Sequence, residues 1–412
     1  MEEWKEYKLG EFMQFNPKER IAKGQIARKI AMDQLLPYRR DVVSNIYEEY
    51  KGGAKFRNGD TIMARITPCL ENGKTSYISS LGKDEVAFGS TEYIVLRNIG
   101  GVSDSKFIYY LSVCPQIREI AIKSMVGSSG RQRVQQDVLE NYCMNLPSLP
   151  TQQKIANILS SLDDKIEVNR RINEQLGELA GALFKSWFVD FAPFKDGEFV
   201  DSELGMIPKG WKVGTLGEYC KVKSGFAFKS SWWQDNGLKV IKIKNITSDG
   251  VLDMNDCSYV SSENTLKAKD FKTNVGDLLI AMTGATIGKF CIISSGEEMY
   301  VNQRVGKFFL GDNPIIKLPF IYCTLKTERV YSEIVNKGQG SAQPNISGSD
   351  IENIHIPMPL NIDLLSLFNG KLKSIFEKMI HNQQEIHHLT TLRDTLLPKL
   401  MSGEIDVNEV EI

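Results

Sequence analysis

The sequence predicts an α+β protein with two tandem-repeated α+β domains separated by two long antiparallel helices that form a coiled coil. Three observations carry this prediction. Two stretches place apolar residues at heptad spacing, several features recur 207 to 217 residues apart in the same order, and short β-branched runs alternate with helical segments between Gly, Asn and Asp turns.

The size and composition of the chain fit a globular protein without a membrane span. Its 412 residues exceed what one hydrophobic core usually serves, which favours two domains plus connecting helices. No run of about eighteen apolar residues occurs, and the start MEEWKEYKLG lacks the basic and then apolar layout of a signal peptide. We therefore expect a cytoplasmic protein. The seven cysteines form no CxxC pair, so we expect reduced, mostly buried thiols.

The first domain is expected over residues 1–150. It opens with Trp4, which Leu9-Gly10 follows five residues later, and β-branched runs at 61–66 and 93–96 predict buried strands. Helical spacing over 106–124 makes the domain α+β. A glycine-rich loop at 128–133 and a Leu-Pro pair close the domain before the long helix begins.

A long central helix is expected over residues 151–188. Its seam steps by four and three residues along Ile155, Leu159, Leu162, Ile166, Asn169, Asn173, Leu176, Ala180, Leu183 and Trp187. A helix of about 35 residues spans on the order of 50 Å, so an ordinary domain cannot bury it and its seam needs a partner helix. Residues 189–210 hold the Pro, Gly and acidic side chains of a linker.

The second domain is expected over residues 211–360 and repeats the first. Trp211 is again followed five residues later by Leu-Gly, and a strand-like run at 278–282 echoes the run at 61–66. The same order of features continues to an Ile-Pro pair that closes the domain. Coincidence does not preserve such an order, so we infer a tandem duplication.

A distal helix is expected within residues 361–412. Its seam runs along Phe368, Leu372, Ile375, Met379, Asn382, Ile386, Leu389, Arg393, Leu396 and Leu400. Asn382 takes the position that Asn169 has in the first helix. Asn at a seam position lowers stability and fixes register. We therefore expect the two asparagines to lie opposite or near one another.

Motifs for catalysis, cofactors and metals are missing. The segment 284–290 is one residue too short for a phosphate-binding loop and has Phe290 where Ser or Thr must hold Mg²⁺, so we expect a structural turn. No Gly-x-Gly-x-x-Gly follows a strand, and three of the four histidines lie on polar sides of the distal helix without carboxylate or thiol partners at a fixed spacing. The sequence therefore predicts no cofactor site and no metal site in this chain.

The charge distribution permits contact with DNA. The net charge of −1 argues weakly against it, but residues 1–150 hold 21 basic and 18 acidic side chains, and residues 211–360 hold 17 and 15. Donors that can contact base edges or phosphates make up the candidate DNA-binding set: Arg39, Arg40, Arg65, Lys74, Ser129, Arg131, Gln132, Arg133, Lys223, Lys229, Lys242, Lys244, Lys289, Arg304, Gln339, Ser341 and Gln343. The loops at 128–133 and 338–343 are the better candidates because they match between the halves.

Together these features resemble the specificity subunit of type I restriction-modification systems. The segment Pro150-Thr151-Gln152-Gln153-Lys154-Ile155-Ala156 looks like the central conserved region of that family, as do Phe188-Val189-Asp190-Phe191 and Gly205-Met206-Ile207-Pro208-Lys209-Gly210-Trp211. The segment 392–400 with Ser402-Gly403 resembles its distal region. The resemblance covers essentially the whole chain.

The resemblance implies a non-catalytic protein that binds double-stranded DNA. Each α+β domain, over residues 1–150 and 211–360, would be a target recognition domain that reads one half of a split, asymmetric sequence, and the helices would fix the distance between the halves. Two modification subunits, which carry S-adenosylmethionine, would dock on the helices, and restriction subunits would join them. The distal copy has Asn361-Ile362-Asp363-Leu364-Leu365 instead of Gln-Gln-Lys-Ile-Ala, which argues against a strictly symmetric complex.

The residues alone leave two other classes of function open. A protein–protein adaptor of the same architecture would need no base contacts, and its basic loops would be incidental. A stand-alone DNA-modifying enzyme would need catalytic motifs that the sequence lacks.

Overall fold

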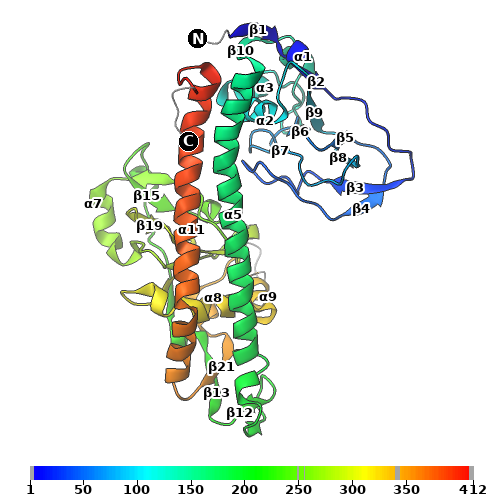
Figure 1. Ribbon diagram of the computed structural model, residues 1–412. Helices are drawn as coiled ribbons and strands as arrows, with labels where there is room; N and C mark the ends of the chain where they lie inside the picture. Colours follow the sequence, from blue (N-terminus) through cyan, green and yellow to red (C-terminus); the bar gives the residue numbers. More distant parts are fainter. Residues whose placement is uncertain (1–3, 248–249, 255, 339–343, 408–412) are drawn as a thin grey trace. The chain divides into compact units, whose positions relative to one another are not determined.

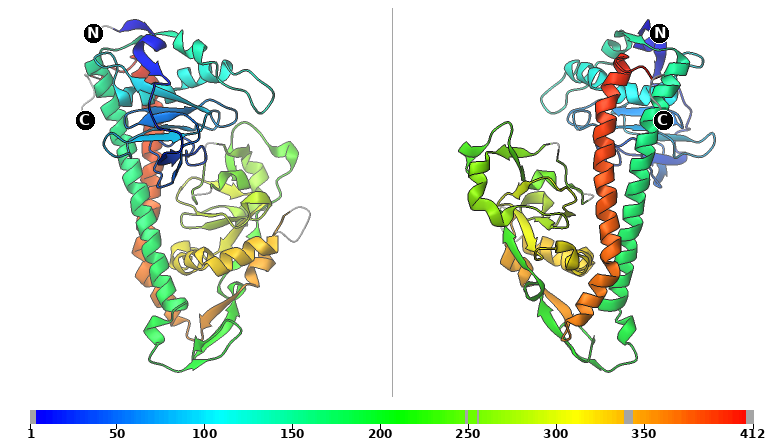
Figure 2. Two further views of the ribbon diagram at one scale, coloured as in Figure 1. Left: turned by 90° about the vertical axis from the view of Figure 1, so that its right-hand side faces the viewer. Right: turned by 60° about the vertical axis from the view of Figure 1, so that its left-hand side comes forward.

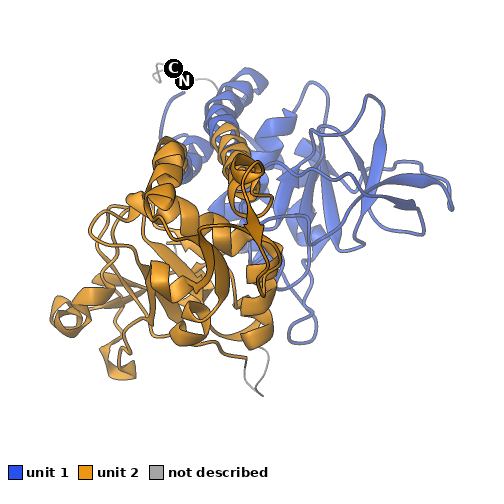
Figure 3. Cartoon of the chain, turned by 90° about the horizontal axis from the view of Figure 1, so that it is seen from below, with its two compact units in different colours: residues 1–167, 388–412 blue, residues 168–387 orange. Residues whose placement is uncertain are grey.

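The chain folds into two compact units (Figures 1 and 3). The computed structural model describes residues 4–247, 250–254, 256–338 and 344–407. One unit comprises residues 1–167 and 388–412, and the other comprises residues 168–387. Each unit contains one α+β domain and parts of two forty-residue helices, α5 (Leu149–Phe188) and α11 (Asp363–Ser402). The predicted fold class is confirmed.

Two four-stranded sheets form the domain of the first unit. One has the order β2 (Met13–Phe15), β9 (Tyr93–Asn98), β6 (Thr61–Ala64), β7 (Thr75–Tyr77), and the other has the order β4 (Tyr47–Glu49), β3 (Ile26–Ile30), β8 (Val86–Gly89), β5 (Lys55–Arg57). The strands β1 (Lys5–Lys8) and β10 (Cys143–Leu146) pair separately. The helices are α1 (Leu9–Phe12), α2 (Ser105–Val113), α3 (Pro115–Lys123) and α4 (Gln136–Glu140).

The domain of the second unit has the same plan. Its four-stranded sheet has the order β14 (Lys221–Ser224), β20 (Val305–Phe309), β17 (Leu278–Ala281), β18 (Phe290–Ile292), and a second sheet has the order β16 (Ser258–Val260), β15 (Leu238–Ile241), β19 (Met299–Val301). The strands β13 (Trp211–Thr215) and β21 (His355–Pro359) pair as β1 and β10 do. The helices are α6 (Leu216–Tyr219), α7 (Ser262–Thr265), α8 (Leu318–Lys326), α9 (Glu328–Gly338) and α10 (Gly348–Glu352).

The pairing pattern confirms the predicted duplication. The central strand β3 runs parallel to β8 in the first unit, and β15 runs parallel to β19 in the second. All other pairings within the two sheets of each unit are antiparallel. The sheets of the two domains match in strand order and in the place of the parallel pair, except that the three-stranded sheet of the second unit has no counterpart of β5, so the domains share a common plan.

The helix expected over 106–124 is two helices. Cys114 adopts an extended conformation between α2 and α3, and Pro115 occupies the first turn of α3. A proline disfavours the helical conformation of the residue before it, which explains the break. The second unit shows the same division, with Thr327 extended between α8 and α9.

The long helices belong to the hydrophobic core of each unit. In the first unit, Ile155 and Leu159 of α5 and Leu400 of α11 share a cluster of buried residues with Phe107 and Leu111 of α2. The second unit packs Phe188 of α5 against Phe368 of α11 and Phe320 of α8, with ring centroids 4.9 and 5.0 Å apart. The helices are therefore walls of the domain cores as well as partners of each other.

Polar pairs define an antiparallel register within each unit. In the second unit, Asn382 Nδ2 donates to Asn173 Oδ1 (2.8 Å), and Asn169 Nδ2 donates to Glu385 Oε2 (2.8 Å). All predicted seam residues of both helices are buried or half-buried, which confirms the seams. Asn169 and Asn382 lie near one another, as expected, but are offset by one helical turn and do not pair directly. Asn173, one turn further along, is the true partner of Asn382.

The linker expected over 189–210 is ordered in the second unit. It contains the short helix η1 (Ala192–Phe194) and the paired strands β11 (Phe199–Val200) and β12 (Ile207–Pro208). Its aromatic side chains pack on Trp211, whose ring centroid lies 5.2 Å from that of Phe191 and 5.3 Å from that of Phe194. The linker thus closes one end of the second core.

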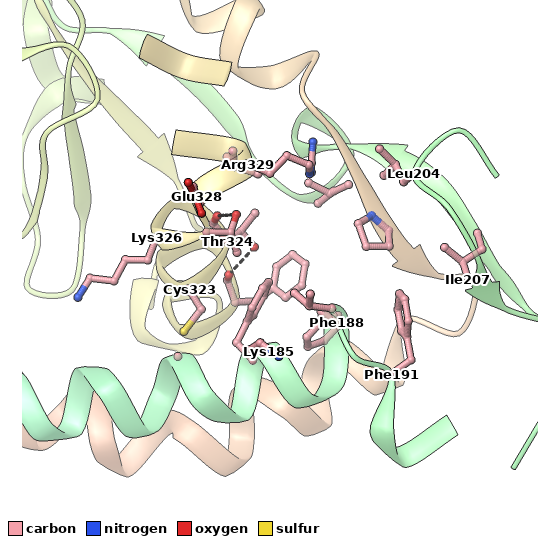
Figure 4. A pocket seen from close by; sticks show the side chains of 18 of the residues that line it. Lys185, Phe188, Phe191, Leu204, Ile207, Cys323, Thr324, Lys326, Glu328 and Arg329 are labelled. Atoms are coloured by element: carbon pink, nitrogen blue, oxygen red, sulfur yellow. Dashed lines mark hydrogen bonds between the residues drawn. The ribbon is translucent and has the colours of Figure 1, made fainter. Parts of the chain in front are cut away.

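A cavity of about 810 Å³ lies beside this linker (Figure 4). Its lining is mostly apolar and includes Phe188, Leu204 and Ile207. Two of its charged side chains have partners, since Lys185 bonds Asp190 and Glu203 Oε1 lies 2.6 Å from His355 Nδ1. None of the residues that line the cavity belongs to the candidate DNA-binding set.

The cysteines are thiols, as expected. All seven lie in the described part of the chain and are free, five of them buried, Cys69 half-buried and Cys143 exposed. Burial raises the pKa of the Cys291 thiol to about 12. Within the described residues, no helix combines the length and apolar character that crossing a membrane requires.

Candidate nucleic-acid interface

The glycine-rich segment of the first unit forms a short hairpin after α3 (Figure 2). Val126 and Arg133 exchange backbone hydrogen bonds of 3.1 and 2.9 Å, and Arg131 N donates to Ser128 O at the tip. Gly127 (φ +135°) and Gly130 (φ +75°) supply backbone conformations that other residues rarely adopt. Residues 126–131 are exposed, so the hairpin carries Ser129 and Arg131 on an accessible tip.

Backbone hydrogen bonds fix the base of this hairpin to the sheet. Arg65 N donates to Glu92 O (2.9 Å), Val134 N donates to Arg65 O (2.8 Å), and Thr67 N donates to Gln132 O (3.0 Å). We call this set of bonds the loop frame of the first unit. It holds Arg65, Gln132 and Arg133 beside the tip.

The Glu92 carboxylate neutralises the positive charge of Arg133 at the base of the hairpin. The Arg133 guanidinium donates to both Glu92 carboxylate oxygens, with Nε to Oε2 at 2.9 Å and Nη2 to Oε1 at 2.7 Å. These hydrogen bonds hold the pKa of the Glu92 carboxyl below its ordinary value, although its partial burial opposes the shift. The Nε of Arg65 is buried and has no hydrogen-bond partner among the described residues.

The second unit repeats the loop frame with other side chains. Met282 N donates to Arg304 O (3.1 Å), Ile346 N donates to Met282 O (3.0 Å), and Gly284 N donates to Pro344 O (3.0 Å). Met282 therefore takes the place of Arg65, and Arg304 takes the place of Glu92. Arg304 is exposed. Gln339, Ser341 and Gln343 of the matching loop lie outside the described residues.

Three other candidates of the first unit are half-buried, and two of them are hydrogen-bonded within the protein. Arg40 donates to Asp41 (2.7 Å) and Asp164 (2.5 Å), and one-tenth of its side chain is exposed. Lys74 Nζ donates to the carbonyl of Met32 (2.8 Å). Arg39 is half-buried. Ser129, Arg131, Gln132 and Arg133 come together with Arg65 in the hairpin and its base.

The remaining candidates of the second unit fall into two groups. Lys223 on β14 is exposed, and Lys289 is half-buried after the turn that joins β17 to β18. That turn is the segment that resembles a phosphate-binding loop, and Gly288 N donates a hydrogen bond to Ala281 O (3.1 Å) across it. Lys229, Lys242 and Lys244 form the second group, around the loop before β15 and the turn after it.

Several residues that shape the interface were not predicted from the sequence. Glu92 and Asp164 each hold a candidate arginine through a long-range ion pair, Glu92 41 residues from Arg133 and Asp164 124 residues from Arg40. No local spacing reveals such partners. The internal repeat was the available signal, because it aligns Glu92 with Arg304 once the loop frames are superposed. Among the described residues, no group of His, Cys, Asp and Glu side chains is placed to hold a metal ion.

Comparisons with a family model and with relatives point to the same kind of protein along nearly the whole chain. The family model described as type I restriction modification DNA specificity domain matches residues 1–178 and again residues 208–390. The chain is 33% identical over 321 residues to the type I restriction enzyme MjaIX specificity subunit of Methanocaldococcus jannaschii, covering 74% of this chain and 70% of that protein. It is 25% identical to the HindI specificity subunit of Haemophilus influenzae, covering 98% and 100%.

A solved structure supports the fold. The crystal structure of a type I restriction-modification system S subunit from M. genitalium aligns with a TM-score of 0.55 at 18% identity, covering 97% of this chain and 96% of that one. At this identity the likeness concerns the fold alone.

Proposed function

Because the chain belongs to the family of type I restriction modification DNA specificity domains, in which it matches the family model twice, we propose that it selects the DNA sequence for a type I restriction-modification complex. Each α+β domain would read one half of a split, asymmetric sequence. The chain itself would perform no catalysis and hold no cofactor.

The observation that carries this proposal is the repeated loop frame with changed side chains. The same three backbone hydrogen bonds occur in both units, yet Arg65 and Glu92 in one correspond to Met282 and Arg304 in the other. A fold that needed these side chains would keep them. Two domains that read different half-sequences need a common backbone and different side chains, which is the arrangement found here.

The chemistry of the hairpin suits contact with base edges. Arginine donates two parallel hydrogen bonds to guanine, and glutamine pairs with adenine in the major groove. The exposed tip presents Arg131, while Gln132 and Arg133 lie nearer the sheet. Backbone amides and hydroxyl groups such as that of Ser129 can position the loop on phosphates without reading sequence. The hairpin thus combines both kinds of contact on one short element.

The helices suit a spacer and a docking surface. A forty-residue helix spans roughly 60 Å at 1.5 Å per residue. We propose two half-sites about one DNA turn apart, a separation of about 34–36 Å that is shorter than either helix. We propose that modification subunits, two of them and each with S-adenosylmethionine, dock on α5 and α11, and that restriction subunits join this complex. The different entry sequences of the two helices favour unequal docking surfaces.

An exchange of residues 1–150 for the equivalent domain of a relative tests this function. Because each domain would read its own half-sequence, the hybrid is expected to alter one half-sequence and keep the other, as seen from the DNA sites that the assembled complex methylates. A change in both half-sequences would contradict independent reading. Methylation of unchanged sites by the hybrid would instead support an adaptor without base contacts, and methyl transfer by the purified chain alone would support an enzyme.

A further inference from the structure

The second unit carries an aromatic cluster beside the strand β15. Phe226, Phe228, Trp232 and Trp233 lie on the loop between β14 and β15 and pack against the buried Val240. The rings of Phe226 and Trp232 stack with an interplanar angle of 6°. The Phe228 ring contacts both indoles, with centroids 6.4 Å from Trp232 and 5.8 Å from Trp233. The two indoles therefore belong to one rigid group.

Two lysines rest on these indoles. Lys242 Nζ lies 3.7 Å from the centroid of the Trp233 ring, and Lys229 Nζ lies 5.4 Å from that of Trp232. Neither lysine has a carboxylate partner among the described residues. A third lysine, Lys244, is nearby in the chain and pairs with Asp256 at 2.6 Å. Burial lowers the pKa of the Lys242 ammonium, and the charge of Lys244 lowers it further. The Asp256 carboxylate, which forms its ion pair with Lys244, opposes this shift, but among the described residues it forms no ion pair with Lys242.

The fold does not require these lysines. After β15, Lys242 N donates to the Asn245 side chain (2.8 Å), and after the equivalent strand β3, Ala31 N donates to the Gln34 side chain (2.7 Å). Lys242 therefore takes the place of Ala31, and Lys244 takes the place of Asp33. The turn forms in the first unit without a cation at either position. The fold of the turn therefore does not depend on Lys242 or Lys244.

In the first unit, Arg28 combines a contact to an aromatic ring with an ion pair. Arg28 on β3 lies 5.3 Å from the ring of Tyr47, but its Nε donates to Glu85 Oε1 at 3.0 Å. That cation is neutralised within the protein. Lys229 and Lys242 contact aromatic rings and have no direct carboxylate partner among the described residues, which leaves both ammonium groups able to meet an external anion.

We propose that Lys229 and Lys242, held on the indoles of Trp232 and Trp233, bind backbone phosphates of the DNA half-site that the second domain reads. This inference rests on the proposed function and assigns these residues to positioning, not to base reading. Lysine acts on a phosphate as a point charge and carries no sequence preference. The ring faces attract the ammonium groups and limit their rotamers, which lowers the entropy lost when DNA binds.

The test measures DNA binding of the full chain in complex with its modification subunits between about 50 and 200 mM salt. Each lost phosphate contact is expected to reduce the slope of log affinity against log salt by about 0.9. The double variant Lys229→Gln/Lys242→Gln should therefore lose about 1.8 in slope, and weaken binding to matched and unrelated duplexes alike. The control Lys267→Gln/Lys269→Gln removes two exposed lysines of the same unit and should leave the slope unchanged.

A Trp233→Leu variant separates support from charge. It keeps both lysines, so the salt slope should stay while affinity falls, and the recognised sequence should not change. Melting curves and assembly with the modification subunits establish that each variant folds. An unchanged slope in the folded lysine variant would overturn the proposal, as would a changed recognised sequence, which would make these lysines base readers. If the unaltered complex bound no DNA in a salt-dependent way, the proposed function itself would fail.

Discussion

At the scale of single residues, the hairpin base divides the arginines into two kinds. Arg133 is held by the Glu92 carboxylate, whereas the side chain of Arg131 has no partner among the described residues. An arginine committed to a carboxylate within the protein must break that ion pair before it contacts DNA. Arg131 meets no such cost, so it is the stronger candidate for a base contact in the first domain.

Replacing Arg131 tests this assignment. The variant Arg131→Gln is expected to weaken binding of the cognate sequence by about 1–3 kcal/mol and to relax preference at one position of one half-sequence. Binding of the assembled complex to duplexes altered one base pair at a time measures both effects. Lys123→Gln, an exposed lysine on α3 paired with Glu119, serves as the control. Equal sequence preference in the unaltered and Arg131→Gln complexes would contradict the assignment.

The acid dependence of the hairpin anchor follows from Glu92. Hydrogen bonds from Arg133 lower the pKa of this carboxyl in the folded state below the ordinary value of 4.5. The stabilising contribution is therefore complete above pH 4.5 and is lost as the pH falls through the lower folded-state pKa. Glu92→Gln should melt at a lower temperature than the unaltered chain at pH 7, and this difference should shrink in acid. A difference that grows as pH falls would show that another group anchors the hairpin.

Residue types alone could not rank the candidate set. A basic side chain next to a glycine-rich loop is a reasonable candidate from sequence, and Arg131 and Arg304 are exposed in the structure. Arg40 looked equivalent in sequence, but it is held by Asp164 on α5. The partner lies 124 residues away, so only the fold brings the two groups together.

At the scale of elements, the seam asparagines define one register of the helix pair. Asn382 is fully buried, and its amide donates to Asn173 while its own Oδ1 has no partner among the described residues. Asn173 Nδ2 donates in turn to the Met379 carbonyl (3.0 Å). A shift of one turn would break both hydrogen bonds; in one direction it would set Asn382 opposite Asn169 and in the other opposite Leu176. The pair therefore disfavours other registers at some loss of stability.

Leucine substitutions test the register role. Asn382→Leu alone removes the hydrogen-bond donor of the half-buried Asn173 oxygen and is expected to cost about 1 kcal/mol of unfolding free energy. The double variant Asn173→Leu/Asn382→Leu removes both partners and should be close to the unaltered chain or more stable. Denaturant unfolding measures the three values. A double variant destabilised by the sum of the single effects would show that the two asparagines act independently.

Long periodic elements were predictable, and their local breaks were not. Heptad spacing gave both forty-residue helices to within a few residues of their ends, because burial along a seam leaves a signal over many turns. The division of the helical segment at Cys114 depended on one proline, and the pairing of Asn382 depended on the axial offset between two helices. Spacing within one helix carries no information about that offset.

At the scale of the whole molecule, duplication explains why the fold was more predictable than the interface. The repeated order of features fixed two domains of one plan, and the loop frames with their matching hydrogen bonds confirm it. The same duplication hides function, because the side chains that differ between the copies are the candidates for DNA recognition. Without a DNA partner, no physical rule states which base each of them faces.

The lengths of the helices set the expectation for the target as a whole. If both domains read DNA at positions fixed by a helical spacer, the unread base pairs between the half-sequences must be constant in number. Insertion of one heptad into α5 with a matching insertion in α11 is expected to lengthen that spacer and leave both half-sequences unchanged. Sequencing of methylated sites in cells that carry the variant measures both quantities. A shift in either half-sequence would show that the helices take part in base recognition.

Single-molecule mapping of methylated sites in a host that carries this chain with its modification and restriction subunits tests the central claim most directly. The account predicts one asymmetric target made of two different half-sequences with a fixed number of unread base pairs between them. A continuous target, or two half-sequences at variable spacing, would contradict it.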